Sequence, residues 1–172
     1  MDLVSKEIFW LDELSKEYND MVGKKCANLG ELVKIGLRVP YGFALSVKAY
    51  ETFMEETGLK EKVAQIVEKE ISAGLDVDKE IDRMIGLSAR IREAIEAADM
   101  PPGMAGHIAK YYSELQKNTG IPDVPCAVRS SGAVSMPGQM ETYLNIKGES
   151  EIINHVKKVW ASAFTTSAIV FR

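Results

Sequence analysis

A long helical block in the middle of this 172-residue chain restricts its possible folds more than any other feature. From about residue 60 to 118 the sequence shows helical periodicity, interrupted by Gly74 and by "MPPG" at residues 100–103. The extended, strand-like runs lie outside this block, on both sides of it. Because a doubly wound sheet needs strands that alternate regularly with helices, the pattern favours an α+β fold with few strands and several helices.

The N-terminal part predicts a strand followed by two helices. Residues 7–14, "EIFWLDEL", are typical of a short strand, and residues 24–36 predict a helix that stops at Gly36. After an extended segment, Ser46 is placed to cap a second helix. The first helix is expected to bury one apolar face, whose members are Cys26, Leu29, Leu32 and Val33.

The C-terminal part predicts two strands and a last helix. Residues 119–125, "TGIPDVP", form a connector, and residues 125–148, "PCAVRSSGAVSMPGQMETYLNIKG", predict two strands around a loop of small residues. Residues 150–164 predict an amphipathic helix. Its apolar stripe is expected to contain Ile152, Val156, Val159 and Ala163.

Charge and composition argue against several classes of protein, including nucleic-acid-binding, membrane and secreted proteins. A formal charge of −4 gives no reason to expect a nucleic-acid partner, and no apolar run is long enough to span a membrane. The N-terminus lacks the apolar stretch of a signal peptide. Cys26 and Cys126 have no metal-like spacing and no disulfide between them is expected, which indicates a cytoplasmic protein. The end of the chain, "TTSAIVFR", is an apolar helical pattern without a cap, so we expect the polypeptide to continue elsewhere.

Common catalytic motifs are missing from the sequence. It contains no Walker A motif, no G-x-G-x-x-G and no G-x-S-x-G. His107 and His155 both lie in predicted helices, without a second potential ligand four residues away, so neither predicts a metal site. No catalytic residue is predicted.

The first of two basic features follows Gly23. Lys24 and Lys25 open a predicted helix, whose N-terminal N–H groups and dipole attract anions. The alternative to an anion site is that Lys24 and Lys25 are surface residues that contact only solvent. The following Cys26 is interpreted as a small apolar residue, although two neighbouring lysines can also lower a thiol pKa.

The second basic feature is Arg129, at the end of the apolar run "CAVR". Its planar guanidinium suits bidentate binding of phosphate oxygens. Ser130 and Ser131 add hydroxyl donors, while Gly132 and Gly138 allow backbone N–H groups to approach a ligand. The alternative to a phosphate-binding role is that Arg129 is a surface residue whose aliphatic carbons cover apolar neighbours.

Two stretches resemble signatures of the pyruvate phosphate dikinase and phosphoenolpyruvate synthase family. They are residues 22–54, "VGKKCANLGELVKIGLRVPYGFALSVKAYETFM", and residues 127–148, "AVRSSGAVSMPGQMETYLNIKG". The resemblance implies that residues 1–172 are the N-terminal part of an ATP-grasp nucleotide-binding domain, with a mainly helical insert at about 60–118. It also implies that Lys25 and Arg129 bind the phosphates of ATP, and that residues 130–140 form a loop over them.

The sequence differs from the family signatures at several positions. Lys24 stands where the family usually has a second glycine, and the loop lacks the Glu-Asp-Leu-Pro that is common in the synthases. "VSMPGQM" is closer to the pyruvate phosphate dikinase version, so the subfamily is open. Neither His107 nor His155 matches the family's phosphate-carrying histidine, which follows a threonine.

The resemblance implies the ATP-phosphate-binding lobe of a phosphotransferase that is inactive alone. The Mg²⁺ ligands, the second lobe and the carrier histidine would lie outside this chain, in cis if it is a fragment or in trans if the enzyme is split. The phosphoryl acceptor is open between pyruvate, a phenol and an antibiotic hydroxyl. The alternative is a non-catalytic interaction or regulatory module that retains the fold.

Overall fold

The computed structural model describes residues 5–72, 80–132 and 141–166. In chain order its elements are β1 (Ile8–Trp10), the 3₁₀ helices η2 (Leu11–Glu13) and η3 (Lys16–Tyr18), α1 (Asn19–Lys34), β2 (Phe43–Leu45), α2 (Val47–Glu56), α3 (Leu59–Ser72), α4 (Glu80–Ala97), α5 (Pro102–Thr119), β3 (Cys126–Arg129), β4 (Thr142–Ile146), α6 (Glu149–Ala161) and the 3₁₀ helix η5 (Ser162–Phe164). The α+β class predicted from the sequence is confirmed.

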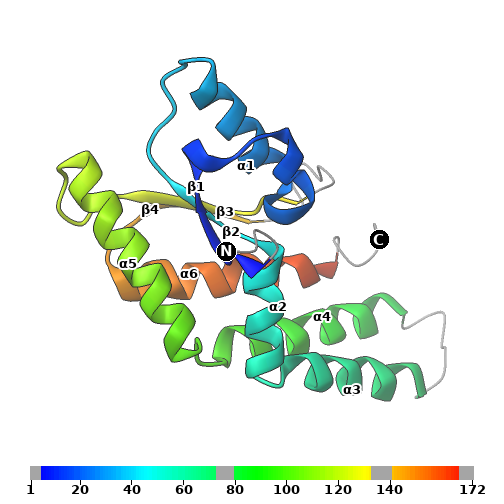
Figure 1. The fold of residues 1–172 in the computed structure, drawn as a ribbon. Helices are drawn as coiled ribbons and strands as arrows, with labels where there is room; N and C mark the ends of the chain where they lie inside the picture. Colours follow the sequence, from blue (N-terminus) through cyan, green and yellow to red (C-terminus); the bar gives the residue numbers. More distant parts are fainter. Residues whose placement is uncertain (1–4, 73–79, 133–140, 167–172) are drawn as a thin grey trace.

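The strands form two small antiparallel pairs. In the β1–β2 pair, Ile8 lies opposite Leu45. In the β3–β4 pair, Arg129 lies opposite Thr142, and the register is irregular between Cys126 and Val128. In Figure 1, β3 and β4 cross the middle of the molecule, between α1 above and α6 beneath. The end of β3 that carries Arg129 therefore lies beside α1.

The helices α3 and α4 extend away from the strands as a pair (Figure 1). They are joined by Glu70 of α3, whose carboxylate accepts hydrogen bonds from Arg83 and Arg90 of α4. Lys157 of α6 donates to the carbonyl oxygens of Glu96 and Ala98, at 2.9 and 2.8 Å. Because Glu96 lies in the last turn of α4 and Ala98 directly follows the helix, the lysine satisfies acceptors that the helix end leaves open.

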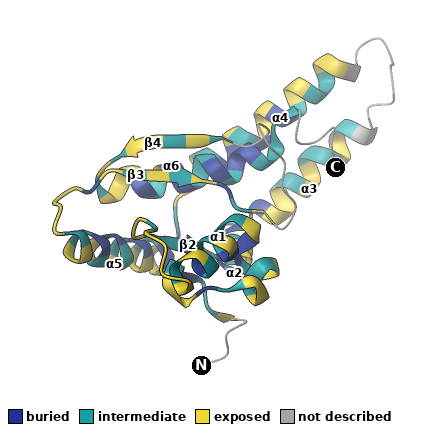
Figure 2. Cartoon of the chain, turned by 90° about the horizontal axis from the view of Figure 1, so that it is seen from above, coloured by how far each residue is buried: buried dark blue, intermediate teal, exposed yellow. Residues whose placement is uncertain are grey.

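The main core lies between the helices and the β3–β4 pair. Phe53, Ile95 and Ile108 are completely buried, and Trp160 packs on the Phe53 ring at a centroid distance of 4.9 Å. In Figure 2 the buried positions run along the inner sides of α5 and α6. The predicted stripe of the last helix is confirmed at Ile152, Val156 and Val159, which are buried, whereas Ala163 falls in η5 and is half-buried.

The predicted buried face of the first helix is only partly right, because Cys26, Leu29 and Val33 are half-buried and Leu32 is exposed. The fully buried residues of α1 are Val22, Gly23, Ala27 and Gly30, while Leu32 is 37% exposed. The reason is close backbone packing, because a Cβ at Gly30 would lie only 2.3 Å from the carbonyl oxygen of Leu14. Small residues therefore make this contact, and the larger apolar side chains lie beside it.

Several local predictions for the N-terminal half hold. The helix α1 ends before Gly36, which has φ +81° and donates its N–H to Val33 O at 2.9 Å. Ser46 caps α2 by accepting the N–H of Ala49 at 3.3 Å. The predicted strand at residues 7–14 is shorter than expected, because the Trp10 N–H donates to the Glu13 carboxylate at 2.7 Å and the chain turns into η2. Among the described residues, none of the helices is long and apolar enough to cross a membrane.

Candidate functional site

The two basic sequence features meet at Gly23. This residue has φ +78° and ψ 159°, a conformation almost restricted to glycine, and it kinks α1. A Cβ built on Gly23 would lie 2.1 Å from the carbonyl oxygen of Ser131. Only a residue without a side chain therefore allows the backbone of α1 to touch the backbone that follows β3.

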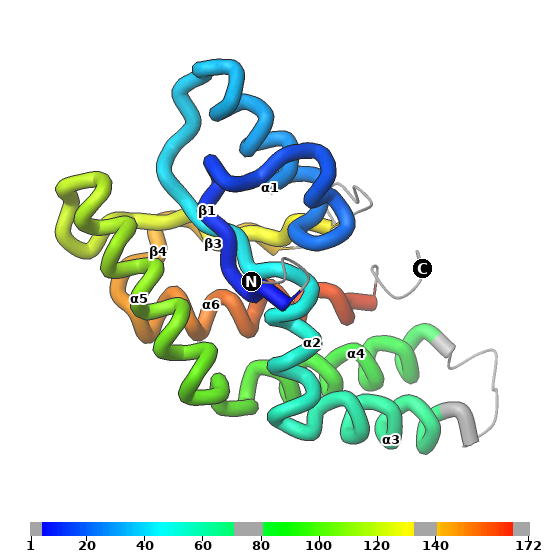
Figure 3. The backbone as a smooth tube through the Cα atoms, viewed as in Figure 1, coloured from blue at the N-terminus to red at the C-terminus, as the bar shows by residue number. Residues whose placement is uncertain are grey.

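Three consecutive residues of α1 bind three consecutive residues after Arg129. The Lys24 N–H donates to Gly132 O at 3.0 Å, and the Cys26 N–H donates to Ser131 Oγ at 3.1 Å. Lys25 Nζ donates to Ser130 O at 3.2 Å. Figure 3 shows the chain after β3 passing close to the first turns of α1. The structure thus brings Lys25 together with Ser130, Ser131 and Gly132, whereas Gly138 lies outside the described residues.

These contacts change one expectation about the helix start. The N–H groups at this helix start are expected to attract an anion, but those of Lys24 and Cys26 are bonded within the protein. Ser130 is buried and contacts Lys25 through its carbonyl oxygen. Ser131 Oγ accepts the N–H of Cys26, and the Ser131 hydroxyl also makes a hydrogen bond with the Cys26 thiol. Binding of an anion at this place therefore relies on side chains more than on these two amides.

Arg129 is an exposed cation of this region. It is the last residue of β3 and is exposed. Within the described part of the chain its guanidinium makes no hydrogen bond and no ion pair. Thr142 lies directly opposite it in β4, and directly opposite residues project to the same face of a strand pair. Sequence reasoning missed this hydroxyl, which only the register of the hairpin identifies.

The Cys26 thiol is affected by its burial and by two neighbouring cations. Burial raises its pKa above the ordinary range, while a hydrogen bond with Ser131 and the charges of Arg129 and Lys25 act in the opposite direction. Both cations are therefore close enough to influence one sulfur atom. The interpretation of Cys26 as a small, inward residue agrees with the raised pKa, and Cys26 and Cys126 are both free thiols.

The two histidines lie in helices, and each is close to a glutamate. His107 in α5 lies 3.4 Å from the Glu7 carboxylate, and buried His155 in α6 donates from Nδ1 to the Glu151 carbonyl at 2.7 Å. The described ranges hold no group of three or more His, Cys, Asp or Glu that could bind a metal ion. The donors around Arg129 are cationic and hydroxylic, which fits phosphate oxygens and does not fit a Mg²⁺ ion.

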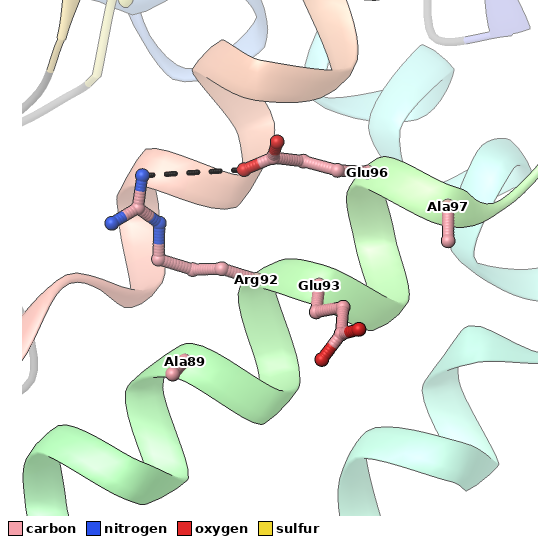
Figure 4. Close-up of a pocket in the computed structure, with 5 residues that line it drawn as sticks. All are labelled: Ala89, Arg92, Glu93, Glu96 and Ala97. Carbon is pink, nitrogen blue, oxygen red and sulfur yellow. Dashed lines mark ion pairs between the residues drawn. The ribbon is translucent and has the colours of Figure 1, made fainter.

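A separate hollow of about 420 Å³ lies along α4. Figure 4 shows Arg92 and Glu96 reaching toward each other across it, at 4.0 Å between Arg92 Nη2 and Glu96 Oε1. The hollow is lined by Ala89, Arg92, Glu93, Glu96 and Ala97. Neither Lys25 nor Arg129 belongs to it, so it is distinct from the cationic region beside α1.

The chain matches the family model described as the pyruvate phosphate dikinase AMP/ATP-binding domain over residues 19–172. It is 42% identical to a probable phosphoenolpyruvate synthase of Staphylothermus marinus over 183 aligned positions, which cover 100% of this chain. It is 41% identical to a probable phosphoenolpyruvate synthase of Methanocaldococcus jannaschii, with 97% of this chain covered. It is 39% identical to a phosphoenolpyruvate synthase of Aeropyrum pernix, with 96% covered.

The aligned region is a small part of each relative. It covers 21% of the S. marinus protein, 14% of the M. jannaschii protein and 20% of the A. pernix protein. The chain therefore spans about a fifth or less of the length of these relatives.

Proposed function

Because this chain belongs to the pyruvate phosphate dikinase AMP/ATP-binding domain family, we propose that it forms the ATP-phosphate-binding lobe of a dikinase-type phosphotransferase. Lys25 and Arg129 are the two cations that hold the phosphates, and Ser131 adds a hydroxyl donor. Gly138 and the loop it belongs to complete the proposed site. The lobe is the N-terminal part of an ATP-grasp domain, in which α3, α4 and α5 form the helical insert.

One observation carries the proposal. The backbone contact between Gly23 and Ser131, with its three hydrogen bonds, joins segments more than a hundred residues apart in sequence. It sets a primary amine beside a strand end whose guanidinium is exposed and has no partner among the described residues. Two cations held close together repel each other, so such an arrangement is expected where an anion binds between them.

The complete enzyme is proposed from the names of the relatives. The relatives named phosphoenolpyruvate synthase suggest pyruvate as the phosphoryl acceptor, with a carrier histidine outside this chain. Mg²⁺ ligands are assigned to the other lobe, because the donor set around Arg129 does not fit that ion. The remaining parts act in cis or in trans, and the free thiols suit a reducing cytoplasm.

Affinity for ATP should be weak in the chain alone. A hydrogen bond to a charged group contributes about 1.5–3 kcal/mol, and association itself costs several kcal/mol before any net gain. With one lobe supplying the contacts, we expect a dissociation constant of roughly 1 mM or higher.

The test is a titration of the 172-residue chain with ATP and with adenosine, followed by ¹⁵N NMR. We expect shifts at residues 24–26 and 129–132 with ATP and none there with adenosine. Lys25→Ala and Arg129→Ala should each weaken ATP binding by about tenfold, from the loss of roughly 1.5 kcal/mol. The matched control is Lys110→Ala, which removes the same charge from the exposed side of α5 and should bind like wild type. Equal binding by all four proteins would refute the proposed site.

A second assay addresses phosphoryl transfer. Phosphoryl transfer needs charge neutralisation on both sides of the transferred group, so the chain alone should take no stable label from γ-labelled ATP. Reconstituted with the missing lobe and the histidine domain, it should support labelling of the carrier histidine, and Arg129→Ala should slow this about a hundredfold. Failure of a reconstituted enzyme that binds ATP normally would favour a regulatory module instead.

A further inference from the structure

Glu141, the residue before β4, joins three elements. Its Oε1 accepts a hydrogen bond from Arg92 Nη2 of α4 at 3.2 Å. Its other carboxylate oxygen accepts the hydroxyl of Tyr143 in β4. Its backbone N–H donates to Ser162 Oγ in η5 at 3.4 Å, and that serine is completely buried. The start of β4 is thus fixed to the helical part of the molecule by Glu141.

Arg92 is poorly explained as a stabilising residue. Its side chain is 32% exposed and the Glu141 side chain 38%, and ion pairs of such exposure add little to stability. Its Nε is buried and has no hydrogen-bond partner among the described residues, which is unfavourable. An aliphatic side chain could line the hollow along α4 without that penalty. The Arg92 guanidinium is therefore better explained by its role in fixing Glu141 and the start of β4 than by a contribution to the stability of the protein.

The start of β4, which Arg92 fixes through Glu141, lies next to Arg129. Thr142 follows Glu141 directly and is the cross-strand partner of Arg129. On the β3 side, the same strand end is fixed by the contacts of residues 130–132 with α1. The strand end that carries Arg129 is therefore held from two sides, by α1 through β3 and by α4 through Glu141 and β4.

We propose that Arg92 and Glu141 are a positioning pair for the nucleotide phosphates, an inference that rests on the proposed function. The pair touches no ligand. It fixes the start of β4, so that the Thr142 side chain and the Arg129 guanidinium face the same phosphate group. The helical block thereby contributes to ATP binding without supplying a contact.

The experiment compares two ion pairs made by the same helix. Arg92→Gln and Glu141→Gln break the proposed pair. Arg90→Gln is the matched control, because it removes an arginine of α4 that pairs with Glu70 of α3 instead. ATP dissociation constants are measured by NMR titration at a temperature where every variant is folded, together with melting temperatures and amide hydrogen exchange at Arg129 and Thr142.

We expect Arg92→Gln and Glu141→Gln to weaken ATP binding by about fivefold to tenfold and to speed exchange at both amides. Arg90→Gln should change the dissociation constant less than twofold, even if it lowers the melting temperature equally. The reciprocal exchange, Arg92→Glu with Glu141→Arg, should bind ATP more tightly than either single charge reversal. A purely structural pair would change melting temperatures without this selective effect.

The outcomes separate the two proposals. If Arg129→Ala weakens ATP binding but Arg92→Gln behaves like Arg90→Gln, the positioning role is refuted and the phosphate site stands. If hydrogen exchange at Thr142 is unchanged in Arg92→Gln, the mechanical link is refuted without reference to ATP. If Arg129→Ala binds ATP like wild type, the phosphate site itself is refuted, and the positioning role with it.

Discussion

Replacement of Gly23 by alanine should damage both the stability of the protein and its candidate site. The new Cβ would lie 2.1 Å from the carbonyl oxygen and 2.3 Å from the carbonyl carbon of Ser131. Both are backbone atoms, so no side-chain rotation relieves the overlap. The first turns of α1 and the segment 130–132 must move apart.

Two contributions set the size of the effect. A non-glycine residue at φ +78° and ψ 159° costs about 1–3 kcal/mol. Separation of the backbones breaks the bonds from Lys24 N to Gly132 O and from Cys26 N to Ser131 Oγ, each worth about 0.5–1.5 kcal/mol. The sum is about 2–6 kcal/mol, a large part of the roughly 5–15 kcal/mol that stabilises a typical domain.

The assay is urea unfolding monitored by the fluorescence of Trp10 and Trp160. The control is Gly120→Ala, a left-handed position with φ +68° at the end of α5, where a Cβ would meet nothing within 4 Å. That variant should lose only about 1–2 kcal/mol, from backbone strain alone. The backbone contact would be refuted if Gly23→Ala were no less stable than Gly120→Ala.

Three further predictions follow from single side chains. Burial raises the pKa of the Cys26 thiol, so a Cys126→Ser protein should react with a thiol reagent at pH 7 more slowly than the same chain in urea; equal rates would contradict the partly buried position of Cys26. Hydrogen bonds from Arg83 and then Arg90 lower the pKa of Glu70 below its ordinary 4.5. The stability that Glu70 contributes is therefore present above that value and lost as the pH falls through the lowered one, so Glu70→Gln should show a shallower loss of stability in acid, measured by urea unfolding from pH 6 to 3. Tyr112→Phe should cost about 1–3 kcal/mol in thermal unfolding, because the buried Tyr112 hydroxyl donates to Val124 O at 3.1 Å and accepts the Gly148 N–H at 3.0 Å; an unchanged melting temperature would show that these groups find other partners.

Local patterns in the sequence predicted most of the helices. The cap at Ser46 and the stop at Gly36 depend on a few neighbouring residues, so turn and cap chemistry was sufficient to place them. The inner face of α1 could not be found in this way. Periodicity counts large apolar side chains, whereas α1 packs through Gly23, Ala27 and Gly30, which are small enough for backbones to touch.

The residues proposed for the candidate site came from the sequence, whereas the contacts between them came from the structure. Lys25 and Arg129 were singled out by charge and by their glycine-rich surroundings, and the resemblance paired them. The contact between Lys25 and Ser130 spans 105 positions, and no local rule predicts such a long-range pairing. Thr142 was missed because its place opposite Arg129 depends on the register of the hairpin, and the strands were predicted without a register.

The most direct test of the shared phosphate site is a crystal structure of this chain soaked with ATP at several times its dissociation constant. The account predicts Lys25 Nζ and the Arg129 guanidinium within about 3 Å of oxygen atoms of the same triphosphate, with the Gly23–Ser131 backbone contact intact. The two side chains on opposite faces, or a triphosphate bound away from both, would contradict it.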